Sequence, residues 1–147
     1  MGGFRILGLE EVVIAVRDAD KAAEDFGRMF GFEFRGGWRL DNEKIRIRME
    51  PLGETQLHLM EPTSPDSVVE GFLEKRGEGL NHIAFRVEGL DSLIEHLRSL
   101  GARLVPDEPV EIIHPYTGER IRYIFIHPKS AHGVLVELIE HLGPGKD

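Results

Sequence analysis

The chain has 147 residues, of which 41% are apolar and 30% charged, and its formal net charge is −8 at pH 7. This length allows one compact domain or two small fused modules and excludes a second large domain, while the acidic surface makes nucleic acid an unexpected partner because it repels phosphate backbones. The chain has no cysteine, so any metal must use His, carboxylate or amide ligands. No apolar run approaches the roughly 20 residues of a membrane span, and the start "MGGFRILGLEEV" lacks a signal-type segment, so we expect a cytoplasmic protein with no membrane partner.

The first half of the chain predicts a strand, a helix and three further strands. Residues 9–34, "LEEVVIAVRDADKAAEDFGRMFGFEF", begin with an alternating apolar run, continue as an amphipathic helix that Gly31 ends, and lead into another strand. The stretches "KIRIRMEPL" and "TQLHLMEP" follow with the period of two that is typical of strands. Residues 65–76 predict a linker helix with Ser64 as its N-cap and Gly77 as its stop.

The second half repeats this pattern. Residues 80–105 can be laid over residues 9–34 at one fixed offset, 80 minus 9 or 71, and the strands "RIRYIFIHP" and "GVLVELIEH" follow. We therefore predict an α+β fold of two tandem βαβββ modules. Residues 1–147 would form one domain, with repeats at about 8–62 and 79–141, whose curved sheets face each other across a cleft.

The repeat pairs imidazoles with carboxylates. His82 falls on Glu11 at the offset of 71, and Glu137 falls on His58 at 137 minus 58, or 79. Because side chains alternate along a strand, all four can lie on the face opposite their apolar neighbours. Each residue alone is best explained as a strand-end charge or a hydrogen-bonded histidine. Together, however, Glu11, His58, His82 and Glu137 are nitrogen and oxygen ligands that suit a divalent metal.

At these residues the chain resembles the vicinal oxygen chelate (glyoxalase/bleomycin resistance/dioxygenase) superfamily and, more narrowly, the methylmalonyl-CoA epimerase family. The stretches that carry the resemblance are "SVVEGFLEKRGEGLNHIAFRV" and "IHPKSAHGVLVELIE". The resemblance implies a glyoxalase-like fold with His82 and Glu137 as metal ligands and His58 at the second-ligand position, where relatives carry Glu or Gln. Relatives open with a ligand His where this chain has Glu11. Either His58 compensates for this exchange or Glu11 does not bind.

The resemblance implies a metal-dependent epimerase of a 2-branched acyl-CoA, methylmalonyl-CoA foremost. The cofactor would be one divalent ion, Co, Ni, Mn, Zn or Mg, that stabilises an enolate, and Glu137 would transfer one proton. Where some relatives carry a second acid, this chain has Arg46, and Glu43 and Glu50 are the nearest carboxylates. Gln56 shares the strand face of His58 and is a fallback ligand.

Substrate contacts are expected from Arg46, which suits an anion if it faces the cleft, and from Lys129 and Ser130, which suit a phosphate-bearing carrier. The connection between residues 109 and 126 is longer than the family leads us to expect and could change the acyl group admitted. The remaining histidines, of which His141 is one, are interpreted as surface, turn, loop or tail residues.

Two other functions stay open at this point. A glyoxalase I-like lyase or isomerase needs the same enolate chemistry. A non-catalytic member of the superfamily would bind a ligand in the same cleft, and its ligand affinity would survive mutation of Glu137. A homodimer is expected because paired modules leave sheet edges to cover.

Overall fold

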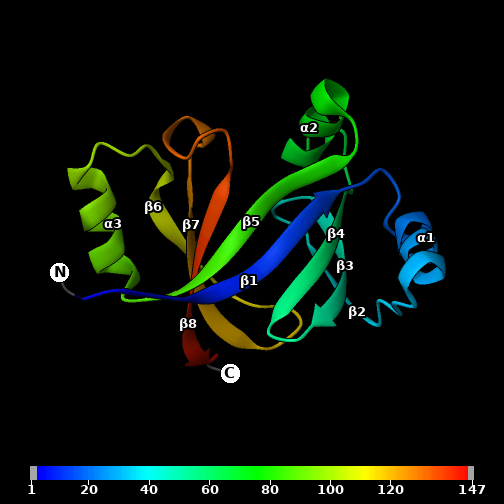
Figure 1. Ribbon diagram of the computed structural model, residues 1–147, viewed down its shortest axis with the longest axis horizontal. Coiled ribbons are helices and arrows are strands. Elements are labelled where there is room, and N and C mark those ends of the chain that lie inside the picture. Colours follow the sequence, from blue (N-terminus) through cyan, green and yellow to red (C-terminus); the bar gives the residue numbers. More distant parts are fainter. Residues whose placement is uncertain (1–2, 146–147) are drawn as a thin grey trace. The chain divides into compact units, whose positions relative to one another are not determined.

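The computed structural model describes residues 3–145 and contains two strand–helix–three-strand halves joined by a helix (Figure 1). The prediction of a mixed α+β fold of two tandem βαβββ modules is confirmed. The elements in chain order are β1 (Arg5–Ala15), α1 (Ala19–Phe30), β2 (Gly36–Leu40), β3 (Ile45–Leu52), β4 (Thr55–Pro62), α2 (Val68–Arg76), β5 (Gly79–Glu88), α3 (Leu90–Ser99), β6 (Leu104–Ile113), β7 (Glu119–Ile126), the 3-10 turn η1 (Pro128–Ser130) and β8 (Val136–Pro144).

Two element boundaries differ from the prediction. Helix α2 begins at Val68, and its N-cap is Ser67, whose hydroxyl accepts a hydrogen bond from Val69 N, rather than Ser64. Residues 32–34 do not form a strand, because the Glu50 carboxylate accepts the N–H groups of Glu33 and Phe34 at 3.0 and 2.7 Å. The chain joins the sheet only at Gly36.

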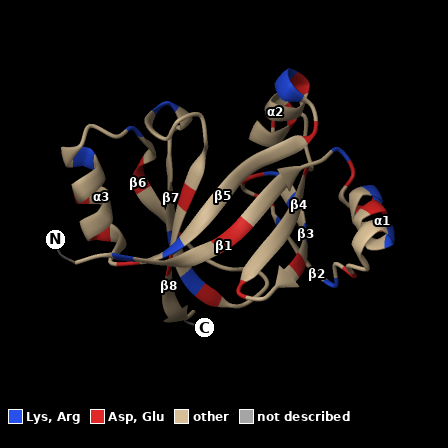
Figure 2. Cartoon of the chain, viewed as in Figure 1, with Lys and Arg blue, Asp and Glu red and all other residues tan. Residues whose placement is uncertain are grey.

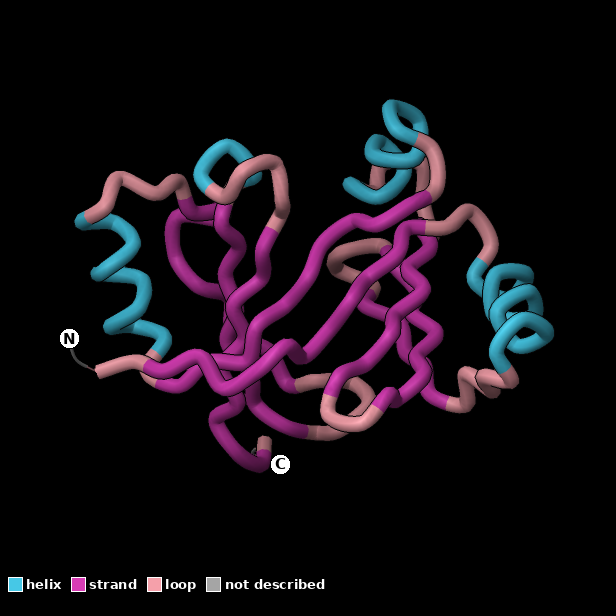
Figure 3. Tube along the Cα trace, viewed as in Figure 1, coloured by secondary structure: helices cyan, strands magenta, loops and turns pink. Residues whose placement is uncertain are grey.

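The chain divides into two compact units. The N-terminal unit is Glu11–Asn81, and the C-terminal unit comprises the described residues 3–10 and 82–145. Figure 2 shows acidic residues on β1. Strands β1 and β5, drawn as long strands in Figure 3, both run across the division, which falls between Glu10 and Glu11 on β1. Each unit therefore contains a piece of both long strands.

The two units have equivalent strand orders, β2-β3-β4-β1 in one and β5-β8-β7-β6 in the other. Strand β1 pairs with β4 in parallel, with Val13 opposite His58, and β5 pairs with β8 in parallel, with Ala84 opposite Glu137. The repeat offsets relate these two pairs, since 13 plus 71 is 84 and 58 plus 79 is 137. The internal repeat is thus preserved down to the strand register.

In the N-terminal unit, each face of the sheet is covered by a different helix. Helix α1 packs through Ala19 and Ala23 onto Leu59 and neighbouring apolar side chains. The opposite face carries a second cluster, which α2 covers with Val69 and Leu73. This second cluster contains Val13, Ala15, Ile45, Ile47, Met49 and Met60. Burial of both faces is what makes this short sheet stable.

In the C-terminal unit, α3 covers one face through Leu90, Leu93 and Ile94, which pack on Leu138 and its neighbours. The opposite face carries a smaller cluster of Ala84, Ile121, Tyr123 and Ile139, with Phe125 packed against it. This face corresponds to the α2-covered face of the N-terminal unit. Both candidate histidines lie on these corresponding faces, because His58 alternates with Leu59 and His82 alternates with Ile83.

Candidate metal and acid–base site

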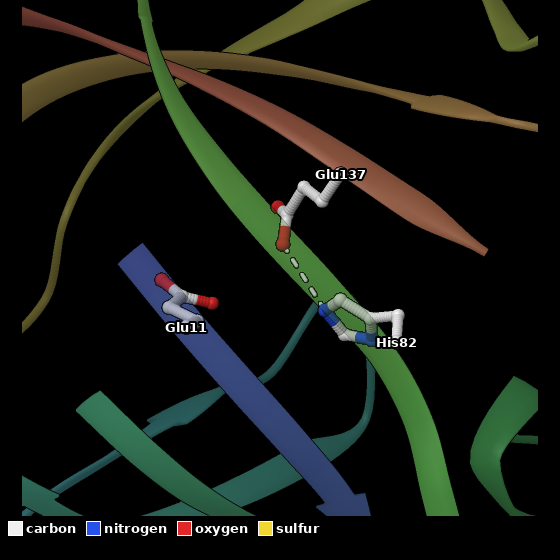
Figure 4. Close-up of side chains that lie close together, drawn as sticks. All are labelled: Glu11, His82 and Glu137. Atoms are coloured by element: carbon white, nitrogen blue, oxygen red, sulfur yellow. Dashed lines mark hydrogen bonds and ion pairs between the residues drawn. The ribbon is translucent and has the colours of Figure 1, made fainter. Parts of the chain in front are cut away.

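The C-terminal unit contains a buried imidazole–carboxylate pair. His82 comes from β5 and Glu137 from β8, and His82 Nε2 lies 3.1 Å from Glu137 Oε1. Figure 4 shows the two side chains pointing toward each other from neighbouring strands. Both residues are about nine-tenths buried, and the ring of Phe125 packs edge-on against His82 with 5.4 Å between the ring centroids. Burial of a charge is costly without a partner, so a buried pair of ionisable groups is a candidate functional site.

The N-terminal unit contains a second pair, which the repeat relates to the first. Glu11 lies on β1 and His58 on β4, with 3.6 Å between Glu11 Oε1 and His58 Nδ1. The other ring nitrogen of His58 lies 2.8 Å from Gln56 Oε1, and the Trp38 ring stands edge-on to the imidazole with 5.0 Å between centroids. Gln56, the fallback ligand, therefore holds His58 in place.

The donor set of these pairs fits a divalent cation. Imidazole nitrogens and carboxylate oxygens suit first-row divalent metals, and hydrogen bonds from neighbouring groups orient such ligands. Two carboxylates would also neutralise a 2+ ion. Both ring nitrogens of His58 face side chains, Gln56 and Glu11.

Arg46 does not lie beside the candidate ligands. It is on the α1 side of β3, where its guanidinium contacts Asp20 at 2.8 Å and Glu61 at 3.6 Å. The hydrogen bonds that Arg46 and Arg48 donate to Asp20 hold the pKa of that carboxyl below its ordinary value. The expected substrate contact of Arg46 was conditional on its facing the cleft. On β3 it alternates with Ile45 and Ile47, which belong to the α2-covered cluster.

The Arg46 contacts belong to a repeated structural motif at the helix N-termini. Glu61 Oε1 accepts a hydrogen bond from Ala19 N at 2.6 Å, at the start of α1. In the second repeat, Glu140 Oε2 accepts from Gly89 N at 2.9 Å, and Arg122 joins Glu140 to an aspartate of α3. A carboxylate at a helix N-terminus satisfies otherwise unpaired N–H groups and complements the helix dipole. No local sequence pattern marks this motif, because each carboxylate meets N–H groups distant in the chain.

Lys129 and Ser130 lie in the exposed turn η1. The Ser130 hydroxyl accepts a hydrogen bond from Arg103 N at 2.9 Å, and His127 Nδ1 accepts from Lys129 N at 3.0 Å. These bonds shape the turn. A contact with a phosphate carrier stays a prediction.

The described carboxylates near β3 give no replacement for the missing second acid on that strand. Glu50 lies on the α1 side and binds the backbone of residues 33–34, and Glu43 lies in the exposed turn before β3. The long connection at residues 109–126 is an extended β6–β7 hairpin whose turn is closed by His114 N donating to Glu119 O at 2.7 Å.

His141, interpreted from sequence as a tail residue, lies instead in β8, where both of its ring nitrogens contact carboxylates. Across residues 3–145, no helix is both long and apolar enough to cross a membrane.

Comparison with known proteins agrees with this fold. A sequence profile of the glyoxalase/bleomycin resistance protein/dioxygenase superfamily matches residues 10–123. The ethylmalonyl-CoA/methylmalonyl-CoA epimerase of Cereibacter sphaeroides is 32% identical over 132 residues, which cover 88% of this chain and 95% of that protein.

Two crystallised relatives are also similar. Methylmalonyl-CoA epimerase from Mycobacterium tuberculosis has a TM-score of 0.80 at 38% identity, covering 96% of this chain and 90% of that one. A variant of the Streptomyces coelicolor methylmalonyl-CoA epimerase, in complex with 2-nitronate-propionyl-CoA, has a TM-score of 0.83 at 32% identity, covering 95% and 100%. The chain belongs to the glyoxalase/bleomycin resistance protein/dioxygenase superfamily and, within it, to the methylmalonyl-CoA epimerase family.

Proposed function

We propose that the protein is an epimerase that inverts C2 of methylmalonyl-CoA or of a close 2-alkylmalonyl-CoA. The observation that carries this proposal is the buried His82–Glu137 pair, in a chain whose relatives are named as epimerases of such thioesters. The C2 hydrogen of a malonyl thioester is acidic, because the negative charge left by its removal spreads onto the thioester oxygen. A positioned carboxylate is therefore a sufficient base.

Glu11, His82 and Glu137 are the proposed core of a metal site, and His58 is the proposed fourth group. A divalent cation held there would supply Lewis-acid stabilisation for the negative charge that develops on the substrate. Co, Ni, Mn, Zn and Mg all accept such ligands. The repeat supports the choice of residues, since each unit supplies one imidazole and one carboxylate from equivalent strands.

Glu137 is proposed to carry one of the two proton transfers. Its burial excludes most water, and His82 Nε2 holds one of its oxygens at 3.1 Å, so the carboxylate keeps a fixed direction. The second transfer needs a group on the opposite side of C2. Strand β3 presents Ile47 and Met49 rather than an acid on the face of His58, so these positions do not supply it.

From the sequence, we also propose that the protein is cytoplasmic and forms a homodimer. Both are independent of the chemistry at C2.

A racemisation assay tests the proposed function. One epimer of methylmalonyl-CoA is incubated with the metal-loaded protein, and the decay of its circular dichroism is followed, with ethylmalonyl-CoA and a glutathione hemithioacetal as parallel substrates. Decay with either acyl-CoA is the expected result. Turnover of the hemithioacetal alone would replace the proposal with a glyoxalase-type isomerase. Tight binding of acyl-CoA without turnover would indicate a non-catalytic binding protein.

A further inference from the structure

A second cluster of titratable side chains lies in the C-terminal unit and uses none of the proposed ligands. Its centre is His141 on β8. His141 Nε2 lies 2.7 Å from Glu10 Oε1 on β1, and His141 Nδ1 lies 3.1 Å from Glu119 Oε2 on β7. The side chains of His141 and Glu10 are 18% and 12% exposed, so water competes little for their contact.

The number of available protons fixes the charge state of this arrangement. An ionised carboxylate only accepts hydrogen bonds, and a neutral imidazole has one N–H to donate. Two hydrogen bonds to two carboxylates therefore require the imidazolium form of His141. The hydrogen bond that His141 donates to Glu10 is the main reason that the pKa of His141 is raised, with burial opposing it.

The other charged groups around His141 come from two further elements. Arg86 on β5 acts against the imidazolium and lowers the pKa of His141. His114, in the β6–β7 turn, has a pKa lowered by burial, and its Nδ1 accepts a hydrogen bond from Tyr116 N at 3.1 Å. The two carboxylates contact different nitrogens of the His141 ring, so they do not converge with it on one point as the ligands of a single metal would.

We propose that the imidazolium of His141 is a clamp that fixes β1 onto β7 and β8 at Glu10, the residue before Glu11, and that this hold is lost when His141 gives up its proton. Since Glu11 follows directly on β1, His141 is then a positioning residue for the metal site. This consequence for the metal rests on the proposed function, whereas the clamp does not.

The pH dependence of the clamp has a definite sign. Because folding raises the pKa of His141, the clamp contributes its full stability below the ordinary histidine pKa of 6.5. The contribution falls as the pH rises through the higher pKa of the folded protein. The clamp therefore holds β1 at acidic and neutral pH and weakens in alkaline solution.

Nuclear magnetic resonance of the histidine side chains in the full chain tests the clamp directly. We expect His141 to titrate above 6.5, with both ring nitrogens protonated below its midpoint, and Glu119→Gln to lower that midpoint. Amide exchange of β1 residues 8–10 should be faster in His141→Gln than in wild type at pH 6, and the two should converge above the midpoint. His132→Asn, in the exposed turn after η1, is the control that should leave β1 unchanged. A midpoint at or below 6.5, or equal β1 exchange in wild type and His141→Gln at pH 6, would overturn the proposal.

Cobalt titration separates positioning from plain stability. The ratio of Co²⁺ affinity between wild type and His141→Gln should be severalfold at pH 6 and approach one above the His141 midpoint. A merely structural loss would give a ratio that does not change with pH, which contradicts a positioning role. If wild type binds no Co²⁺ at any pH, the proposed metal site fails, while the titration and exchange results still decide the clamp.

Discussion

Replacement of Glu137 by Gln removes the proposed base while keeping its shape. Gln retains an oxygen at the position that contacts His82 Nε2 at 3.1 Å, and the site is 8% exposed, so water has little room to take over the proton transfer. Loss of a general base costs about 10²–10⁴-fold in rate, or about 2.7–5.4 kcal/mol of transition-state stabilisation. The free energy of unfolding should change by only about 1 kcal/mol.

Glu140→Gln is the matched control, because Glu140 lies three residues further along β8 on the α3 side. It accepts from Gly89 N and Leu90 N at 2.9 and 3.3 Å, so its loss should cost about 1 kcal/mol of stability and leave the rate within about threefold. Racemisation rates from circular dichroism and urea unfolding curves give both quantities for each variant. If Glu137→Gln kept more than a third of the wild-type rate, or if Glu140→Gln lost as much activity, Glu137 would not be the base.

Three further predictions follow from the same contacts. Arg46→Met should lower the free energy of unfolding, because it breaks the contacts to Asp20 and Glu61. It should leave KM for the acyl-CoA within about threefold. A tenfold rise in KM at unchanged stability would instead show that Arg46 contacts the substrate. Leu59→Ala, at a position 0% exposed, should cost about 2–5 kcal/mol in urea unfolding, whereas Val68→Ala, at 89% exposed, should cost less than about 0.5 kcal/mol; equal costs would contradict the described core. Light scattering should give a mass of twice 16.6 kDa for a homodimer, and a mass of 16.6 kDa would show a monomer.

The fold could be read from the sequence because each half carries the same local signals. The apolar alternation of β1 and β5 is a local signal, and so is the amphipathic pattern of the helices that follow them. Each signal occurs once in each half of the chain. Strand alternation predicts that His82 and Glu137 each lie opposite their apolar neighbours, but the contact between these residues, 55 apart in the chain, has no local signal.

The remaining features depend on contacts between distant residues. The side of β3 on which Arg46 lies stayed open, because the alternation gives two faces but does not say which one α1 covers. The carboxylates at the helix starts, Glu61 and Glu140, act on N–H groups more than forty residues away. His141 and Glu10 are 131 residues apart in the chain, and no local pattern marks their contact.

Solvent deuterium exchange at C2 tests the central claim most directly. Methylmalonyl-CoA in deuterium oxide is incubated with the metal-loaded protein, and the C2 proton signal is followed by nuclear magnetic resonance, with chelator-treated protein and Glu137→Gln alongside. The account predicts rapid loss of the C2 proton with the loaded wild type alone and recovery when metal is restored. Loss of the proton at the same rate in the chelated protein or in Glu137→Gln would contradict a metal-assisted epimerase that uses Glu137.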